Sequence, residues 1–382
     1  MASLPRTSEG WQELADDVAD AAFGRALRDP AALADAVRSL SEVYTKDREH
    51  LERARTRRAL EARLRFYFLR DLHKPLVPLA ELAFAGELTQ PHWRVLDLGA
   101  GLGTTSCGVA QAAAERGASV EVEAVDADGA ALALAERIFR TAGIRARTHV
   151  GDVTRPPVHG AFDLVVFGLV LNELPFAERV RAVTGAAERL GPNGAIVVLE
   201  PALKSVTRAL HELRAELLSA GLHVFAPCLH EEPCPMLASP RDWCHESRPF
   251  AFGDELKKVA RAAGLRFERI TYAYLTLVTH GRSLRSALGG GARVVSERLV
   301  SKGKAELFVC DGSGHRRLGR LDRHRPKGND PFGDARRGDV LFTDGAVPKG
   351  DGLRVVPETR VALRRPGRSG LPRSRDEGKR AR

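Results

Sequence analysis

The stretch Val95-Leu-Asp-Leu-Gly-Ala-Gly-Leu-Gly-Thr-Thr decides the fold of this 382-residue chain. Its apolar start is typical of a short buried strand, and the segment after the glycines is typical of a helix. Gly99, Gly101 and Gly103 allow the backbone to turn tightly and to approach a ligand closely. The stretch therefore predicts a strand, a ligand-binding turn and a helix, a combination that also serves dinucleotides.

The residues around this turn alternate between strand and helix patterns. Short apolar runs at 119–126, 162–170 and 194–200 predict strands, and the segments 104–115, 130–142 and 176–190 predict helices. Regular alternation of this kind indicates a parallel, doubly wound α/β sheet. Residues 11–88 have helical periodicity throughout, and two β-rich runs follow residue 268. The sequence thus predicts an α/β fold with a helical N-terminal subdomain and a β-rich C-terminal module.

Three acidic residues favour S-adenosylmethionine as the ligand of the glycine turn. Asp97 precedes the glycines, where it can face a cationic amino group. Asp126 ends the second strand, where a carboxylate can accept both ribose hydroxyls. Asp152 follows the third strand, where it can meet the adenine amine. This set in this order resembles the class I methyltransferases, whose sheet is Rossmann-like, and it gives Asp97, Gly99, Gly101, Gly103, Asp126 and Asp152 as candidate cofactor-binding residues.

The end of the fourth strand supplies the candidate catalytic residues. Asn172 and Glu173 lie in Leu169-Val-Leu-Asn-Glu-Leu-Pro, where substrate-facing groups emerge in class I enzymes. Helix capping at the rim explains the same pair equally well. No general base is evident from the sequence, so whether the chain is a catalyst or only a binding protein stays open at this point.

Four of the five cysteines form a pattern that suits a metal. Their gaps are x5, x9 and x65, and they are Cys228, Cys234, Cys244 and Cys310. Four thiolates complete either a tetrahedral zinc site or a cubane iron–sulfur cluster. Zinc sites usually contain closer pairs, although His230 or His245 could substitute for one sulfur. Spacing alone leaves zinc and iron–sulfur level.

The flanking residues resemble a known family. Pro227-Cys-x-His-x-x-Pro-Cys-Pro, Asp242-Trp-Cys-His, Tyr272-Ala-Tyr-Leu and Phe308-Val-Cys-Asp-Gly are similar to segments of the mitochondrial ribosomal small-subunit methyltransferase-like assembly factors and their bacterial relatives. The resemblance covers roughly residues 60–345. It implies a [4Fe–4S] cluster on the four cysteines, a bound S-adenosylmethionine and association with small-subunit ribosomal RNA. The segment Cys-His-Glu-Ser-Arg departs from the family, which tends to have an aromatic residue after the histidine, but it removes no ligand.

Charge and composition bear on the partner and the compartment. The net charge is +10, and residues 311–382 hold 19 Lys+Arg against 10 Asp+Glu, which is +9. This asymmetry favours a polyanionic partner such as RNA, although a solvated tail gives the same pattern. The sequence predicts no membrane association, no DNA partner and a cytoplasmic location, where clustered cysteines are better interpreted as metal ligands than as disulfides.

Four segments are expected along the chain. A helical subdomain should span residues 1–90, and a cofactor-binding methyltransferase domain should span 91–222. A metal-cluster segment with a β-rich module should follow at 223–345. Residues 346–382, rich in Gly, Pro and Arg, are expected to form a basic tail without regular structure.

Overall fold

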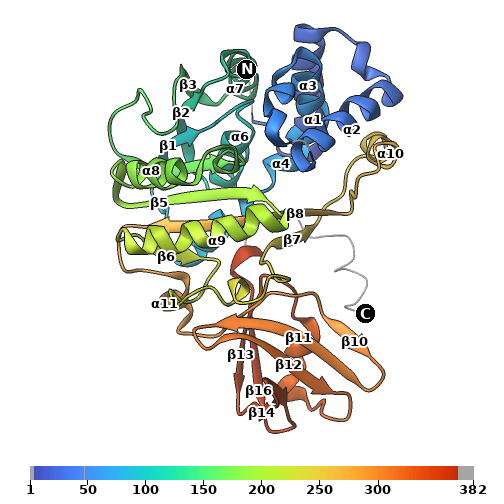
Figure 1. Cartoon of the computed structure of the whole chain (residues 1–382), viewed down its shortest axis with the longest axis vertical. Coiled ribbons are helices and arrows are strands. Elements are labelled where there is room, and N and C mark those ends of the chain that lie inside the picture. The colour runs from blue at the N-terminus through green and yellow to red at the C-terminus, as the bar shows by residue number, and fades with distance from the viewer. Residues whose placement is uncertain (1–3, 47, 369–382) are drawn as a thin grey trace.

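Two β-sheets and a group of N-terminal helices make up the computed structural model, which describes residues 4–46 and 48–368 (Figure 1). The helices and helical turns are α1 (Ser8–Phe23), η1 (Ala26–Arg28), α2 (Pro30–Thr45), η2 (Arg48–Arg55), α3 (Arg57–Ala62), η3 (Arg63–Tyr67), α4 (Phe68–Leu72), α5 (Leu76–Phe84), α6 (Thr104–Ala114), α7 (Gly129–Ala142), η4 (Leu171–Glu173), α8 (Phe176–Ala187), α9 (Lys204–Ser219), η5 (Pro235–Leu237), α10 (Asp254–Ala262), α11 (Leu284–Leu288), η6 (Lys327–Asn329), α12 (Pro331–Asp334) and η7 (Pro366–Arg368).

The first sheet is the doubly wound one that the sequence predicts. Its strands are β1 (His92–Leu98), β2 (Ser119–Asp126), β3 (Arg145–Val150), β4 (Phe162–Gly168), β5 (Leu190–Pro201), β6 (His223–Ala226), β7 (Glu246–Pro249) and β8 (Arg269–Val278). They are ordered β3-β2-β1-β4-β5-β8-β6, and β7 also pairs with β8. Strands β1 to β5 are parallel, whereas β8 runs antiparallel to β5. Three of the eight strands thus come from beyond residue 222.

Helices cover both faces of this sheet. On one face, Val95, Val122 and Val197 belong to a core shared with α5, α6, α7 and the N-terminal helices. On the other face, Val165 and Ile196 pack in a second core with α8 and α9. Successive residues of one strand point to opposite faces, so these nearly continuous apolar strands supply both cores.

The second sheet forms the lower part of the molecule (Figure 1). Its strands are β9 (Ala292–Val294), β10 (Leu299–Ser301), β11 (Lys304–Asp311), β12 (Gly314–Leu321), β13 (Val340–Asp344), β14 (Val347–Lys349), β15 (Gly352–Val355) and β16 (Arg360–Arg364). Their order is β14-β15-β12-β11-β9-β13-β16, with β10 beside β11. A separate core, with Leu307, Leu318 and Phe332 among its members, supports the sheet. The β-rich C-terminal module is therefore present.

A buried ionic contact joins the helical region to both sheets. Glu81 of α5 is fully buried and accepts hydrogen bonds from Arg293 of β9 at 2.6 Å and from Tyr274 of β8 at 2.7 Å. A buried carboxylate is tolerated only when its charge is paired and hydrogen-bonded. This contact fixes the second sheet against the first.

Two local features differ from the sequence expectation. The apolar segment around residues 66–82 predicts a helix pair broken at Pro75 and Pro78. The break at Pro75 is confirmed, because α4 ends at Leu72 and α5 begins at Leu76, but Pro78 does not break the helix: it lies in the first turn of α5, where an N–H group is not needed. Residues 347–368, expected to lack regular structure, form β14, β15, β16 and η7. The buried side chains of Val355 and Val361 attach these strands to the core of the second sheet. The sequence hides this pattern, because the apolar residues are few among Gly, Pro and Arg. Residues 369–382 lie outside the described part of the chain.

Candidate functional site

The glycine turn joins β1 to α6 at the carboxyl edge of the first sheet. Gly99, Gly101 and Gly103 have φ values of 78°, 51° and 71°, which L side chains rarely adopt. A Cβ atom at Gly99 would lie 2.5 Å from the side chain of Val170, and one at Gly103 would lie 2.4 Å from the ring of Phe139. Both the backbone conformation and the available space therefore require glycine, as the sequence predicts for a turn that approaches a ligand.

Asp97 lies behind this turn and is fully buried. Its Oδ2 atom accepts hydrogen bonds from the backbone N–H of Ser106 at 3.2 Å and from the Ser106 hydroxyl at 2.6 Å. Its Oδ1 atom has no hydrogen-bond partner among the described residues. Burial raises the pKa of the Asp97 carboxyl to about 7, although the Ser106 hydrogen bonds oppose that rise. Asp97 is not among the residues that line the cavity beside the turn. Its predicted contact with a cationic amino group of the ligand stays a prediction.

The two other acidic residues predicted for the cofactor line one cavity with Gly99 and Gly101, whereas Gly103 is not among its lining residues. Asp126 ends β2, and its carboxylate accepts the backbone N–H of Gly101 and that of Asp128, both at 2.8 Å. Asp152 follows β3 and accepts the backbone N–H and hydroxyl of Thr154 at 2.8 and 2.9 Å. The carboxyl edge of a parallel sheet thus brings these groups together, which is where open α/β sheets bind ligands. Their individual contacts with a cofactor stay predictions.

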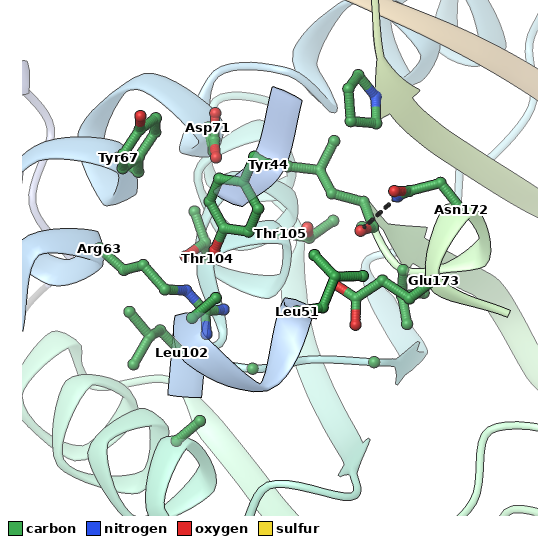
Figure 2. Close-up of a pocket in the computed structure, with 18 of the residues that line it drawn as sticks. Tyr44, Leu51, Arg63, Tyr67, Asp71, Leu102, Thr104, Thr105, Asn172 and Glu173 are labelled. Carbon is green, nitrogen blue, oxygen red and sulfur yellow. Dashed lines mark hydrogen bonds between the residues drawn. The ribbon is translucent and has the colours of Figure 1, made fainter. Parts of the chain in front are cut away.

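The cavity has a volume of about 810 Å³ and is closed on its far side by the N-terminal helices. Figure 2 shows Tyr44, Arg63 and Tyr67 facing the turn residues across this space. The sequence predicted only a helical subdomain for residues 1–90, so it did not reveal these wall residues. The one usable signal was the spacing of Arg63 and Tyr67, four residues apart and therefore on one side of a helix.

The candidate catalytic pair lies on the opposite wall of the cavity. Leu169, directly after β4, has a φ of 68°, and its carbonyl accepts the side-chain amide of Asn172 at 2.9 Å. The backbone N–H of Asn172 donates to the buried Glu200 at 3.1 Å. Glu173 lies 4.0 Å from Arg55 of η2. A left-handed non-glycine residue is unusual and concentrates at functional sites. Asn172 and Glu173 thus border the cavity, and their catalytic role stays a prediction.

The four cysteines gather where the two sheets meet. Cys228 follows β6, Cys234 precedes η5, Cys244 precedes β7, and Cys310 lies on β11 of the second sheet. All four are reduced and partly exposed. The structure therefore brings one residue of the second sheet to a loop region attached to the first.

The thiols of this group influence one another electrostatically. Burial, together with Cys228 and Cys234, raises the pKa of the Cys244 thiol to about 12. Burial also raises the pKa of Cys310, with further contributions from the other three cysteines. His230 lies beside them, with Nε2 3.5 Å from Sγ of Cys310.

Proximity does not amount to a formed metal centre. Within residues 4–46 and 48–368, no three His, Cys, Asp or Glu side chains are arranged so that they could hold a metal ion. Four cysteine sulfurs are the donor set of a tetrahedral zinc site or a cubane cluster, and metal binding requires them to be deprotonated. The residue types therefore suit either metal centre, but the described side chains are not arranged as a metal site.

Arginines hold the cysteine-bearing segment by its backbone, a feature that the sequence did not reveal. Arg208 of α9 donates to four carbonyl groups of that segment, those of Met236, Leu237, Ser239 and Asp242, at 2.8–3.3 Å. Arg214 donates to His230 and Glu232 in the same way. Three more arginines each reach one or more carbonyls at its ends: Arg285 to Leu229, Arg293 to Pro227 and Arg337 to His245. The segment is thus positioned by side chains from four other elements or loops.

The sheet order and the glycine turn define a Rossmann-like, class I methyltransferase fold. Residues 78–339 match the family described as mitochondrial small ribosomal subunit Rsm22, which is more than half of the chain. The chain belongs to this family, and the resemblance seen in its sequence is confirmed. No curated protein matches the chain.

Several solved structures are similar to parts of this chain. A TehB-like S-adenosylmethionine-dependent methyltransferase from Corynebacterium glutamicum is 18% identical, with 53% of this chain and 88% of that chain covered and a TM-score of 0.32. The magnesium protoporphyrin IX methyltransferase of Synechocystis, solved with bound S-adenosylmethionine, is 15% identical, with 64% and 97% covered and a TM-score of 0.36. A class I methyltransferase from Listeria monocytogenes is 11% identical, with 71% and 88% covered and a TM-score of 0.39.

Among the described residues, every helix is too short or too polar to span a bilayer.

Proposed function

We propose that this chain is an S-adenosylmethionine-binding, [4Fe–4S]-containing methyltransferase-like protein that acts on the small ribosomal subunit and its RNA. One combination carries the proposal: a glycine-floored, acid-lined cavity occurs in a chain of the Rsm22 family. We also propose that the protein acts in the cytoplasm, as expected for a bacterial relative. The family description names the mitochondrial subunit.

The cavity supplies polar groups that match the proposed cofactor. Asp126 and Asp152 can accept the ribose hydroxyls and the adenine amine, and the unpartnered Oδ1 of the buried Asp97 can accept a hydrogen bond from the ammonium group. Methyl transfer would form a bond from an acceptor atom to the methyl carbon, while the carbon–sulfur bond breaks and its electron pair stays on sulfur. Glu173, at the cavity wall, can receive a proton that the acceptor loses, or solvent can take it.

The four cysteines would hold the cluster, and its role would be structural. Cys228, Cys234 and Cys244 belong to the segment after β6, whereas Cys310 belongs to the second sheet. Bound metal would therefore tie the second sheet to the first, and ligand binding of this kind contributes to folding. Zinc, with His230 as a substitute ligand, is the alternative.

Metal and sulfide analysis of anaerobically purified protein tests the cluster. The proposal expects iron, acid-labile sulfide and a brown colour, with all three lost in Cys234→Ser and kept in Cys107→Ala, because Cys107 is buried within α6. Colourless protein that carries stoichiometric zinc would rule out iron–sulfur.

An aromatic and basic surface on the second sheet supports RNA as the partner. Phe308 of β11 and His315 of β12 stack with ring centroids 5.0 Å apart, and the exposed Arg317 lies over Phe308 at 5.6 Å. Aromatic rings beside arginine guanidinium groups are the usual platform for unpaired RNA bases. If this platform works with the basic C-terminal segment, RNA affinity should fall steeply as salt rises.

The second candidate function is a ribosome assembly factor that uses S-adenosylmethionine only as a structural ligand. It is favoured by the rim contacts of Asn172, whose backbone and side-chain amides both bond to the protein itself. A third candidate is a small-molecule methyltransferase with a zinc module. It explains neither the aromatic and basic surface on the second sheet nor the match to a ribosomal family.

A substitution in the glycine turn discriminates between the first two functions. Gly101→Ala should prevent cofactor binding, because its φ is positive and its Cβ would lie 2.8 Å from Arg63. If a methyl mark on small-subunit RNA disappears while subunits still assemble, the chain is an enzyme. Unchanged marks with defective assembly would identify the binding factor.

A further inference from the structure

One arginine of the N-terminal helices reaches the glycine turn. Arg63 lies in η3, and a Cβ atom at Gly101 would lie 2.8 Å from its Nη2 atom. The guanidinium therefore rests directly on the backbone of the turn. Figure 2 shows the Arg63 side chain extending from its helix into the cavity, towards Leu102 and below Tyr44.

The backbone of η3 is irregular where Arg63 begins it. The backbone N–H of Phe68 donates to the carbonyl of Arg63, five residues earlier, so the helix is locally wound as a π-helix. Such turns insert one extra residue and are frequent at functional sites. Arg65, two residues on, points away from the cavity and binds Asp16, Asp20 and Glu61 at 3.0, 2.8 and 2.9 Å. The two arginines of this turn thus have opposite surroundings.

Arg63 differs from Arg65 in lacking a bonded anion. Within residues 4–46 and 48–368, its guanidinium makes no hydrogen bond or ion pair that meets ordinary distance limits. Burial disfavours its charge, but Tyr44, Glu173, Asp126 and Asp128 outweigh burial and raise the pKa of Arg63. The side chain is therefore a charged donor, held in the cavity with its hydrogen-bonding capacity unused.

Besides Arg63, four cations among the described residues line the cavity: Arg55, Arg70, Lys74 and Arg266. Of these five, only Arg63 is near a Cβ atom built at Gly101. Lys74 is buried and pairs with Asp71 at 2.7 Å. Arg55 lies 4.0 Å from Glu173, and Arg266 is exposed at the rim. Arg63 is the cation that the structure places against the glycine turn.

The proposed cofactor carries one anionic group. Its ribose hydroxyls, adenine amine and ammonium group donate hydrogen bonds or positive charge, and these suit the acidic residues around the turn. Its carboxylate needs a donor instead, and an arginine fork matches a carboxylate with two parallel hydrogen bonds. We propose that Arg63 binds the α-carboxylate of S-adenosylmethionine, so that the N-terminal helices complete the cofactor site. This inference rests on the proposed cofactor but concerns one residue of this chain.

The expected effect follows from the strength of such contacts. A hydrogen bond to a charged group changes affinity by about 10- to 150-fold in a partly buried site. Wild-type protein should therefore bind S-adenosylmethionine about 10- to 150-fold more tightly than its decarboxylated analogue, which keeps the ammonium, sulfonium and adenosyl groups.

Titration calorimetry of both compounds tests the proposal with the full chain. Arg63→Met should lower the affinity for S-adenosylmethionine by that same factor and leave the affinity for the decarboxylated analogue unchanged. Arg63→Lys should recover part of the loss, because it restores the charge without the fork. Arg58→Met, an exposed arginine of the neighbouring α3, should behave as the wild type for both compounds.

Three results would overturn the proposal, and they are distinguishable. Equal wild-type affinity for the two compounds would show that the carboxylate is not recognised. Equal weakening of both compounds by Arg63→Met would show that Arg63 only supports the shape of the cavity. If wild-type protein bound neither compound, the cofactor itself would be wrong, and the proposed function would fail together with this inference. Circular dichroism of each variant establishes that it is folded.

Discussion

The buried carboxyl group of Asp97 should make the stability of the chain depend on pH near neutrality. Its pKa rises from 3.8 to about 7 because the side chain is removed from water. The folded state therefore prefers the neutral acid. The resulting stabilisation is complete below the unfolded pKa of 3.8 and is lost as the pH rises through about 7. Integrating this difference gives a loss of about 3 kcal/mol between about pH 5 and about pH 8.

Asp97→Asn isolates this contribution, because the amide has nearly the same shape and cannot ionise. Urea unfolding of both proteins across this range, without cofactor, should show the wild type losing about 3 kcal/mol relative to the variant. Ser106→Ala, which removes a hydrogen bond that lowers the Asp97 pKa, should move the loss to higher pH. If the wild type and Asp97→Asn had parallel pH profiles, Asp97 would not be the perturbed acid and the argument from burial would be refuted.

Three further substitutions test other parts of the structure. Gly99→Ala should abolish S-adenosylmethionine binding in calorimetry, because the added Cβ atom would overlap the side chain of Val170. Gly117→Ala, also at positive φ but with open space around it, should bind normally. Equal binding by the two variants would contradict the steric argument. Arg65→Met should cost about 3–5 kcal/mol in thermal unfolding, since the buried Glu61 loses its cation, whereas Asp16 and Asp20 keep Arg28. A loss no greater than that of the exposed Arg25→Met would show the Arg65 ion pairs to be unimportant. Arg208→Met should reduce the iron content of purified protein, because four carbonyls of the cysteine segment lose their donor; full iron content would mean that the segment needs no such support.

The sheet and the glycine turn were predictable because their signals are local. Short apolar runs predict the strands. Gly99, Gly101 and Gly103 have positive φ values, which glycine adopts more readily than any other residue. Asp126 and Asp152 follow from the same topology, since the carboxyl ends of β2 and β3 meet at one edge. These residues could be placed in one cavity without any knowledge of distant contacts.

The remaining wall of the cavity was not predictable from the sequence. Arg63 and Arg65 belong to the same charged run, yet one lines the cavity and the other is buried among three carboxylates. A π-helical turn and the docking of α1 decide between them, and neither is visible in local composition. The arginines around the cysteine segment were missed for the same reason, because Arg208 and Arg293 reach it from distant elements.

The cysteines are an intermediate case. Their spacing predicted a shared site, and the structure brings all four into one electrostatic neighbourhood across two sheets. Spacing could not choose between zinc and iron–sulfur, because both are satisfied by four thiolates. The choice between the two metals depends on ligand geometry. Sequence reasoning cannot supply that geometry, because Cys310 is far from the other three cysteines along the chain.

Crosslinking of the chain to RNA in the cells that produce it tests the central claim most directly. Ultraviolet irradiation, stringent purification and sequencing of the bound RNA should recover small-subunit ribosomal RNA, with the yield reduced in Phe308→Ala, which removes the stacked ring on β11. Recovery of no ribosomal RNA from the wild-type protein would contradict both the enzyme and the assembly-factor forms of the account.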